Sequence, residues 1–176
     1  MNLMGKARKH GLEKTAKMVM INTIDFAIWD DLLQRYVDDF GRVNYRRLKA
    51  ESAEVLREWL ETLADVDLAA VKDADVRLAL WLNAYNAIAI SQVLEVYPIG
   101  SIRPKVLGIP NWLAFLDFFT RSNSTIAGKK YSLNQIEHGI LRREFTEPRI
   151  HFALVCASVG CPMLRRGAYF HESVRT

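Results

Sequence analysis

The stretch "VRLALWLNAYNAIAISQVLEVY", from Val76 to Tyr97, decides the fold of this chain of 176 residues. Apolar side chains occupy nearly every side of a helix drawn through it, which is typical of a helix that is buried all round. Asp75 is the expected N-cap, and Pro98 should stop the helix because proline disfavours a helical residue before it. We therefore predict a central buried helix over residues 76–97.

Two asparagines lie in the middle of this apolar helix. Asn83 and Asn86 are three residues apart and so share a face. Burying either side chain without partners costs about 1 to 3 kcal/mol per unsatisfied group. Both amides must therefore bind something. They either hold the backbone of a neighbouring loop, or they orient a catalytic histidine or donate to an oxyanion, as asparagine does in Cys-His-Asn hydrolases.

Helices and turns are expected on both sides of the central helix. Helical spacing of apolar residues predicts helices at Ile28–Phe40, which Gly41 ends, at Arg47–Leu63 and at Trp112–Phe119. A small hairpin is expected at Ile126–Tyr131 around Gly128, and Ser132 should cap a helix from Leu133 to about Arg142.

One segment reads as a strand. The run Ile150–Ala157 is almost entirely apolar, which is typical of a strand buried on both faces. The expected fold is thus a mostly helical α+β domain, with the central helix (about 76–97) packed on a small β-sheet that includes strand 150–157. We expect a flexible basic arm over residues 1–24 and a single domain over residues 25–176.

The charge of the chain is concentrated in its first residues. The formal net charge is +4, and residues 1–17 hold five bases and one acid, so the remaining 19 basic and 19 acidic residues balance. A neutral body with a short basic arm does not predict nucleic-acid binding, which usually appears as a basic stripe on a folded domain. The apolar run Met18–Ile21 is too short for a signal peptide or a membrane span. We expect a cytoplasmic protein without a membrane partner, in which the two cysteines are free thiols rather than a disulfide.

The reactive side chains gather near the expected strand. On a strand His151 and Cys156 would point to opposite faces and lie about 16 Å apart, so they cannot form a dyad with each other. Cys156 and Cys161 have the spacing C-x4-C, which is longer than the usual metal or redox C-x-x-C. Cys161 precedes a proline and is the better placed for exposure, whereas Cys156 can also be read as a small core residue.

His138, next to Glu137, is a candidate partner for a thiol. It can be solvated, cap the end of its helix, or face the strand as a general base, and an imidazole would activate a cysteine as the thiolate. A zinc site built from both cysteines, His138 and His151 is numerically possible, but the opposed directions of His151 and Cys156 argue against it. We expect neither a metal nor another cofactor. Gly-rich phosphate loops, G-x-S-x-G and H-E-x-x-H are absent from the sequence.

Four ordered blocks resemble a known family. They are Tyr36–Tyr45 (YVDDFGRVNY), Trp81–Ala87 (WLNAYNA) with Tyr97–Ile99 and Ser101–Ile102, Ser132–Leu141 (SLNQIEHGIL), and Pro148–Ser158 (PRIHFALVCAS) with Cys161–Pro162. In these blocks the chain is similar to members of the DUF547 domain family, whose activity is unassigned. The resemblance implies a role for the polar residues on the motif positions, which are Asn83, Tyr85, Asn86, Glu137, His138, His151, Cys156, Ser158 and Cys161.

The resemblance also implies an incomplete C-terminal side. Members of the family usually continue past the Cys-Pro block through further helical sequence, whereas this sequence ends at Thr176. We therefore expect an open site, or a partner or second copy that covers that side.

The leading hypothesis for the function is a thiol-dependent hydrolase or acyltransferase that acts on a small molecule or a peptide. Its nucleophile would be Cys161 or Cys156 and its base His138 beside Glu137. Asn83 or Asn86 would orient the base, and Tyr85, Ser158 and His151 would contact the substrate. The chain order Asn, His, Cys reverses that of papain-like enzymes. The alternatives are a noncatalytic binding or scaffold domain in which the same polar residues are structural, and a Cys/His metal-binding domain.

Overall fold

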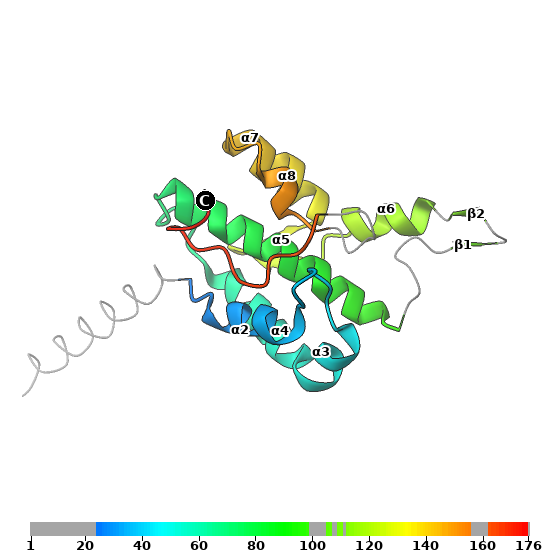
Figure 1. Cartoon of the computed structure of the whole chain (residues 1–176). Coiled ribbons are helices and arrows are strands. Elements are labelled where there is room, and N and C mark those ends of the chain that lie inside the picture. Colours follow the sequence, from blue (N-terminus) through cyan, green and yellow to red (C-terminus); the bar gives the residue numbers. More distant parts are fainter. Residues whose placement is uncertain (1–23, 99–104, 107–108, 111, 156–161, 176) are drawn as a thin grey trace, which may run out of the picture.

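A computed structural model of the chain describes residues 24–98, 105–106, 109–110, 112–155 and 162–175. Helices dominate these residues and two short hairpins accompany them (Figure 1). In chain order the elements are α2 (Ala27–Tyr36), α3 (Tyr45–Glu51), α4 (Ala53–Thr62), η1 (Leu63–Asp65), α5 (Ala74–Val96), β1 (Lys105–Val106), β2 (Ile109–Pro110), α6 (Trp112–Thr120), β3 (Ser124–Ile126), β4 (Lys129–Tyr131), η2 (Gln135–Leu141), α7 (Arg142–Glu144) and α8 (Ile150–Ala153).

Helix α5 is the centre of the fold, as predicted. Figure 1 shows it running through the middle of the molecule, with α2, α3 and α4 on one side and α7 and α8 on the other. Its N-cap is Asp73 rather than Asp75, because the Asp73 carboxylate accepts hydrogen bonds from the backbone N–H groups of Asp75 (2.8 Å) and Val76 (3.2 Å). The helix ends before Tyr97 and Pro98, where the chain becomes extended. The part of the chain that the structure describes holds no helix long and apolar enough to cross a bilayer.

Helices α2 and α4 join the core through aromatic rings. Trp29 on α2 and Trp59 on α4 stack with their ring centroids 5.7 Å apart, and both side chains are buried. The Trp59 indole N–H also donates to the backbone carbonyl of Asp25 at 2.9 Å. These contacts hold α2 and the residues just before it against α4.

The predicted helix at Arg47–Leu63 is in fact broken at Ser52 into α3 and α4. Ser52 is buried, and its hydroxyl lies 2.8 Å from the hydroxyl of Tyr36, the last residue of α2. Helix α2 ends at Tyr36, four residues before the predicted end at Phe40. It ends there because Val37 is extended and pairs with Val43 in an antiparallel bridge.

The second hairpin and its cap follow the prediction. Strand β3 pairs with β4 in antiparallel register, from Ser124 opposite Tyr131 to Ile126 opposite Lys129. The two turn residues, Ala127 and Gly128, both have positive φ angles of 50° and 72°, as a type I′ turn requires.

Ser132 caps the helix that follows the hairpin. Its hydroxyl accepts from the N–H of Gln135 (3.2 Å), and the Gln135 side chain accepts from the N–H of Ser132 (2.9 Å), which forms a reciprocal capping box. The helix itself differs from the prediction, since η2 is a π-helix that a short α-helical segment, α7, continues.

The predicted strand at 150–157 is wrong over the residues that the structure describes. Ile150–Ala153 form the helical turn α8, and the chain becomes extended only at Leu154. Ile150 is buried but Phe152 is 69% exposed, so the run is not covered on both faces. A short apolar run cannot be assigned to strand or helix by periodicity alone, which explains the error. The fold is the predicted mostly helical α+β domain, but its hairpins are elsewhere in the chain, and residues 156–157 lie outside the description.

Candidate functional site

Asn83 binds the backbone of the C-terminal segment, which comprises residues 162–175. Its Nδ2 donates to the carbonyl of Tyr169 at 2.8 Å, and its Oδ1 accepts from the N–H of the same residue at 2.9 Å. The Asn83 side chain has no exposed surface, so these bonds form away from water and are correspondingly strong. One carboxamide on α5 therefore binds both backbone polar groups of a single residue, Tyr169.

Asn86 does the same for the segment that follows α8. Its Nδ2 donates to the carbonyl of Ala153 at 2.9 Å, and its Oδ1 accepts from the N–H of Val155 at 3.0 Å. Val155 is the residue immediately before Cys156. The central helix thus binds the backbone of the residue immediately before the first cysteine.

Tyr85, between the two asparagines, faces Glu137 on η2. The pKa of the Tyr85 hydroxyl is raised, mainly because the side chain is buried. The negative charge of Glu137 and its hydrogen bond with Tyr85 raise this pKa further. Glu137 is also held by Arg142, whose Nη2 and Nε lie 2.6 Å and 3.1 Å from Oε1 of the carboxylate. A phenol, a carboxylate and a guanidinium therefore meet between α5 and the end of η2.

The two predicted histidines lie near this group but face water. The side chain of His138 is 58% exposed, and its Nε2 lies 4.0 Å from Oε1 of Glu137. His151 is exposed on α8, with its ring 5.5 Å from that of Phe152 in an edge-to-face contact. The His138 imidazole is thus accessible to a ligand in solution.

The structure brings only some of the predicted residues together. Asn83, Tyr85 and Asn86 lie on α5, and Glu137 joins Tyr85 from η2. Cys156, Ser158 and Cys161 lie outside the described residues, so their predicted roles remain predictions. Within the described ranges, no three histidine, cysteine or acidic side chains gather as a metal site needs.

A family model described as "Protein of unknown function, DUF547" matches residues 69–176. The chain belongs to the DUF547 family. The match includes α5 and every predicted site residue, whereas α2, α3 and α4 precede it. No curated protein and no solved structure matches the chain.

Two contacts of the candidate site could not be predicted from the sequence, that of Arg142 with Glu137 and that of Tyr169 with Asn83. Arg142 lies five residues after Glu137, and side chains five apart are not neighbours on an α-helix. A π-helix has hydrogen bonds between residues five apart, and η2 adopts this form over Gln135–Leu141. Tyr169 contributes only backbone groups to Asn83, and residue types give no signal for such a contact.

The raised pKa of Tyr85 makes stability fall at high pH. The folded protein keeps the Tyr85 proton above pH of about 10, where the unfolded chain loses it. The stabilisation is complete below that pH and is lost as the pH rises toward the folded pKa. We expect Tyr85→Phe to make the decline in the urea midpoint above about pH 10 less steep, while Tyr45 and Tyr169, whose pKa values burial also raises, retain the rest of it. Glu137→Gln should flatten it only partly, because burial remains, and equal slopes in all three proteins would contradict the assignment.

Proposed function

We propose that this DUF547 protein is a thiol-dependent hydrolase or acyltransferase, with Cys156 or Cys161 as the nucleophile. The observation that carries the proposal is the anchor at Asn86, which holds Ala153 and Val155 on the central helix. A covalent catalyst needs its nucleophile fixed to within a fraction of an ångström, and elements packed in the core provide this better than free loops.

His138 is the proposed base. It follows Glu137, which Arg142 and Tyr85 fix in place, so the backbone that carries the imidazole is also held from the core. π-Helical turns occur frequently at functional sites, and η2 is one. Such a turn supports a site at this end of the molecule.

The proposed reaction needs only the groups of this chain and an acyl substrate. The imidazole takes the thiol proton, and the thiolate attacks the acyl carbon to form a carbon–sulfur bond. The bond to the leaving group breaks, and the imidazolium protonates that group as it departs. Water or an acceptor amine or alcohol then attacks the thioester, gives its proton to the imidazole and releases the thiol.

The test is the pH dependence of alkylation by iodoacetamide. We expect one of the two cysteines, identified with Cys156→Ser and Cys161→Ser, to react with an apparent pKa well below the usual value of about 8.5. His138→Ala should return that pKa toward the usual value. His171→Ala is the matched control, since His171 is similarly exposed on the C-terminal segment, and it should change nothing.

If both thiols have an apparent pKa near 8.5 in every variant, the result contradicts the proposed enzymatic function. They would favour a noncatalytic binding domain. One observation supports this alternative: the oxygen of each α5 asparagine and one donor of its amide already bind backbone groups. In that case Cys156→Ser should lower the melting temperature and leave partner binding intact.

A further inference from the structure

A pocket of about 170 Å³ lies where α5, α8 and the C-terminal segment meet. Its lining residues come from three distant parts of the chain, residues 78–82, 147–153 and 165–174. Figure 1 shows the C-terminal segment, in red, crossing α5, to which Asn83 binds it. The pocket thus forms only when these three parts of the chain pack together.

The two buried asparagines of α5 fix two walls of this pocket. Asn83 binds the backbone of Tyr169, and Asn86 binds the carbonyl of Ala153. Tyr169 and Ala153 both line the pocket. A site binds more tightly when its walls are held in place before the ligand arrives, because less conformational freedom is lost on binding. The amides of α5 therefore give this pocket a preformed shape.

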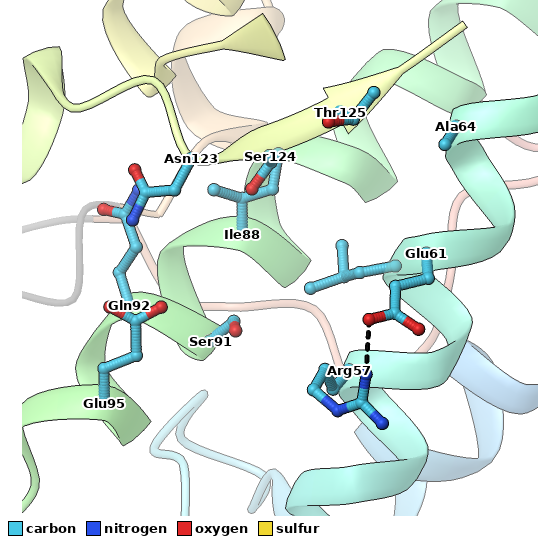
Figure 2. A pocket seen from close by; sticks show the side chains of 11 residues that line it. Arg57, Glu61, Ala64, Ile88, Ser91, Gln92, Glu95, Asn123, Ser124 and Thr125 are labelled. Atoms are coloured by element: carbon cyan, nitrogen blue, oxygen red, sulfur yellow. Dashed lines mark hydrogen bonds and ion pairs between the residues drawn. The ribbon is translucent and has the colours of Figure 1, made fainter. Parts of the chain in front are cut away.

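Arg165 is the unusual charge of this pocket. The other arginines that line this pocket or three further pockets of the described chain all form ion pairs, and they are Arg35, Arg42, Arg57, Arg142, Arg149 and Arg166. Figure 2 shows one of these pairs, between Arg57 and Glu61. Arg165 has no carboxylate partner among the residues that the structure describes. Its guanidinium is therefore available to an anion.

Tyr169 holds this guanidinium in place. Arg165 lies over the Tyr169 ring, with its Cζ 5.3 Å from the ring centroid. In such a cation–π contact the N–H groups at the edge of the guanidinium can still bind a carboxylate through two hydrogen bonds. Because Asn83 binds the Tyr169 backbone, the cation is positioned from the core of the protein.

The charges of the pocket favour an anionic ligand. Besides Arg165, the charged lining residues are Arg149 and Glu147, which form an ion pair through two N–O contacts of 2.8 Å. Two guanidinium groups and one carboxylate leave the lining with a net charge of +1. Since the Glu147 carboxylate is already paired, its repulsion of a bound anion is reduced.

The pocket also offers apolar surface. Ala153 and Val174 are half-buried in its walls, and the lining side chain of Phe152 is 69% exposed. A ligand that covers such an exposed ring gains free energy from the apolar area removed from water. A cavity of about 150 Å³ holds one benzene molecule, so the pocket accepts a branched or cyclic group of about that size.

We propose that the pocket binds a small apolar group that carries a carboxylate. The carboxylate binds Arg165, and the apolar part covers Phe152 and Ala153. Two kinds of ligand share this chemistry, a free short-chain carboxylic acid and the C-terminal residue of a peptide with an apolar side chain. The inference goes beyond the thiol chemistry proposed above and does not depend on it, because binding requires neither cysteine.

The experiment compares a probe for each kind of ligand, isovalerate for the free acid and N-acetyl-alanyl-leucine for the peptide. Their affinities for the full chain are measured at pH 7 by saturation-transfer NMR titration. We expect at least one of them to bind saturably, and the amide of that probe to bind about fivefold or more weakly. Acetate, which lacks the branched apolar group, should also bind about fivefold or more weakly. The tighter probe identifies the kind of ligand.

Arg165→Gln tests the proposed contact directly. It should weaken binding of the preferred carboxylate by about fivefold or more and leave binding of the corresponding amide unchanged. Arg143→Gln is the matched control, since Arg143 is exposed on α7 and does not line the pocket, and it should change neither affinity. Both arginines are exposed, so both variants should unfold at the wild-type urea concentration.

Four results would overturn the proposal. They are equal affinities for the carboxylate and its amide, an unchanged ratio of these affinities in Arg165→Gln, an equal loss in Arg143→Gln, and no saturable binding of either probe. None of them bears on the proposed nucleophile. Conversely, thiols with an ordinary pKa would contradict the enzyme and leave this binding site unaffected.

Discussion

Replacing Asn83 with leucine is expected to lower the free energy of unfolding by about 3 kcal/mol. Leucine has nearly the same size but cannot hydrogen-bond, so the N–H and C=O of Tyr169 would lose both partners in the core. Each buried polar group left without a partner costs about 1 to 3 kcal/mol, and this exceeds the gain from an added apolar side chain. The measurement is urea denaturation followed by circular dichroism.

Asn134→Leu is the matched control for Asn83→Leu. Asn134 is exposed just before η2 and makes no side-chain hydrogen bond to that helix, so the same chemical change should alter the free energy of unfolding by less than about 0.5 kcal/mol. If both variants unfold at the wild-type urea concentration, the bonds of Asn83 do not contribute to stability.

Gly41→Ala is expected to destabilise the protein by about 3 kcal/mol or more. Gly41 has a φ of 71°, where an L residue is strained by about 1 to 2 kcal/mol. A Cβ there would also lie 2.6 Å from the backbone nitrogen of Leu164 and 2.9 Å from Cβ of Met163. Because the first of these atoms is backbone and Leu164 is buried, the C-terminal segment would have to shift.

Gly128→Ala isolates the conformational part of this effect, so the difference between the two variants is the steric part. Gly128 has nearly the same φ, 72°, but a Cβ there would meet no atom within 4 Å. Its loss of stability should thus be the conformational strain alone, about 1 to 2 kcal/mol. Thermal unfolding of both variants gives the comparison, and equal losses would show that Gly41 is not in close contact with the C-terminal segment.

The sequence predicted the elements whose signals are local. The central helix follows from apolar residues on all sides between Val76 and Val96, and its end follows from Pro98. The hairpin follows from Gly128 in a two-residue turn, and the cap from the hydroxyl of Ser132 three residues before Gln135. In each case a nearby residue determines the backbone conformation, so no distant contact was needed.

The errors come from tertiary contacts that outweigh local pattern. The apolar spacing of Arg47–Leu63 continues through Ser52, but the hydroxyl of Tyr36 binds Ser52 where the two helices separate. The apolar residues of Ile150–Ala157 predict a strand, yet a helical turn lets Ile150 reach the core while Phe152 stays exposed. The spacing of apolar residues along the sequence carries no information about either contact.

The candidate site was predictable in composition but not in geometry. The burial of Asn83 and Asn86 requires hydrogen-bond partners, and the sequence allows either backbone groups or a catalytic side chain as those partners. That the partners are Tyr169, Ala153 and Val155 could not be read from residue types. The burial of Gln92 without a hydrogen-bond partner gave no signal in the sequence, because residue type alone does not show which glutamine of a helix lies inside.

The asparagine bonds of α5 also bear on the order of folding during synthesis. They join residues 86 positions apart for Asn83 and up to 69 apart for Asn86, and such distant contacts form late and slow folding. Until residues 153–169 have left the ribosome, the nascent helix carries two amides that the core cannot satisfy. The fully packed state should therefore be reached after translation of this segment, and a chain stalled earlier should be a substrate for chaperones.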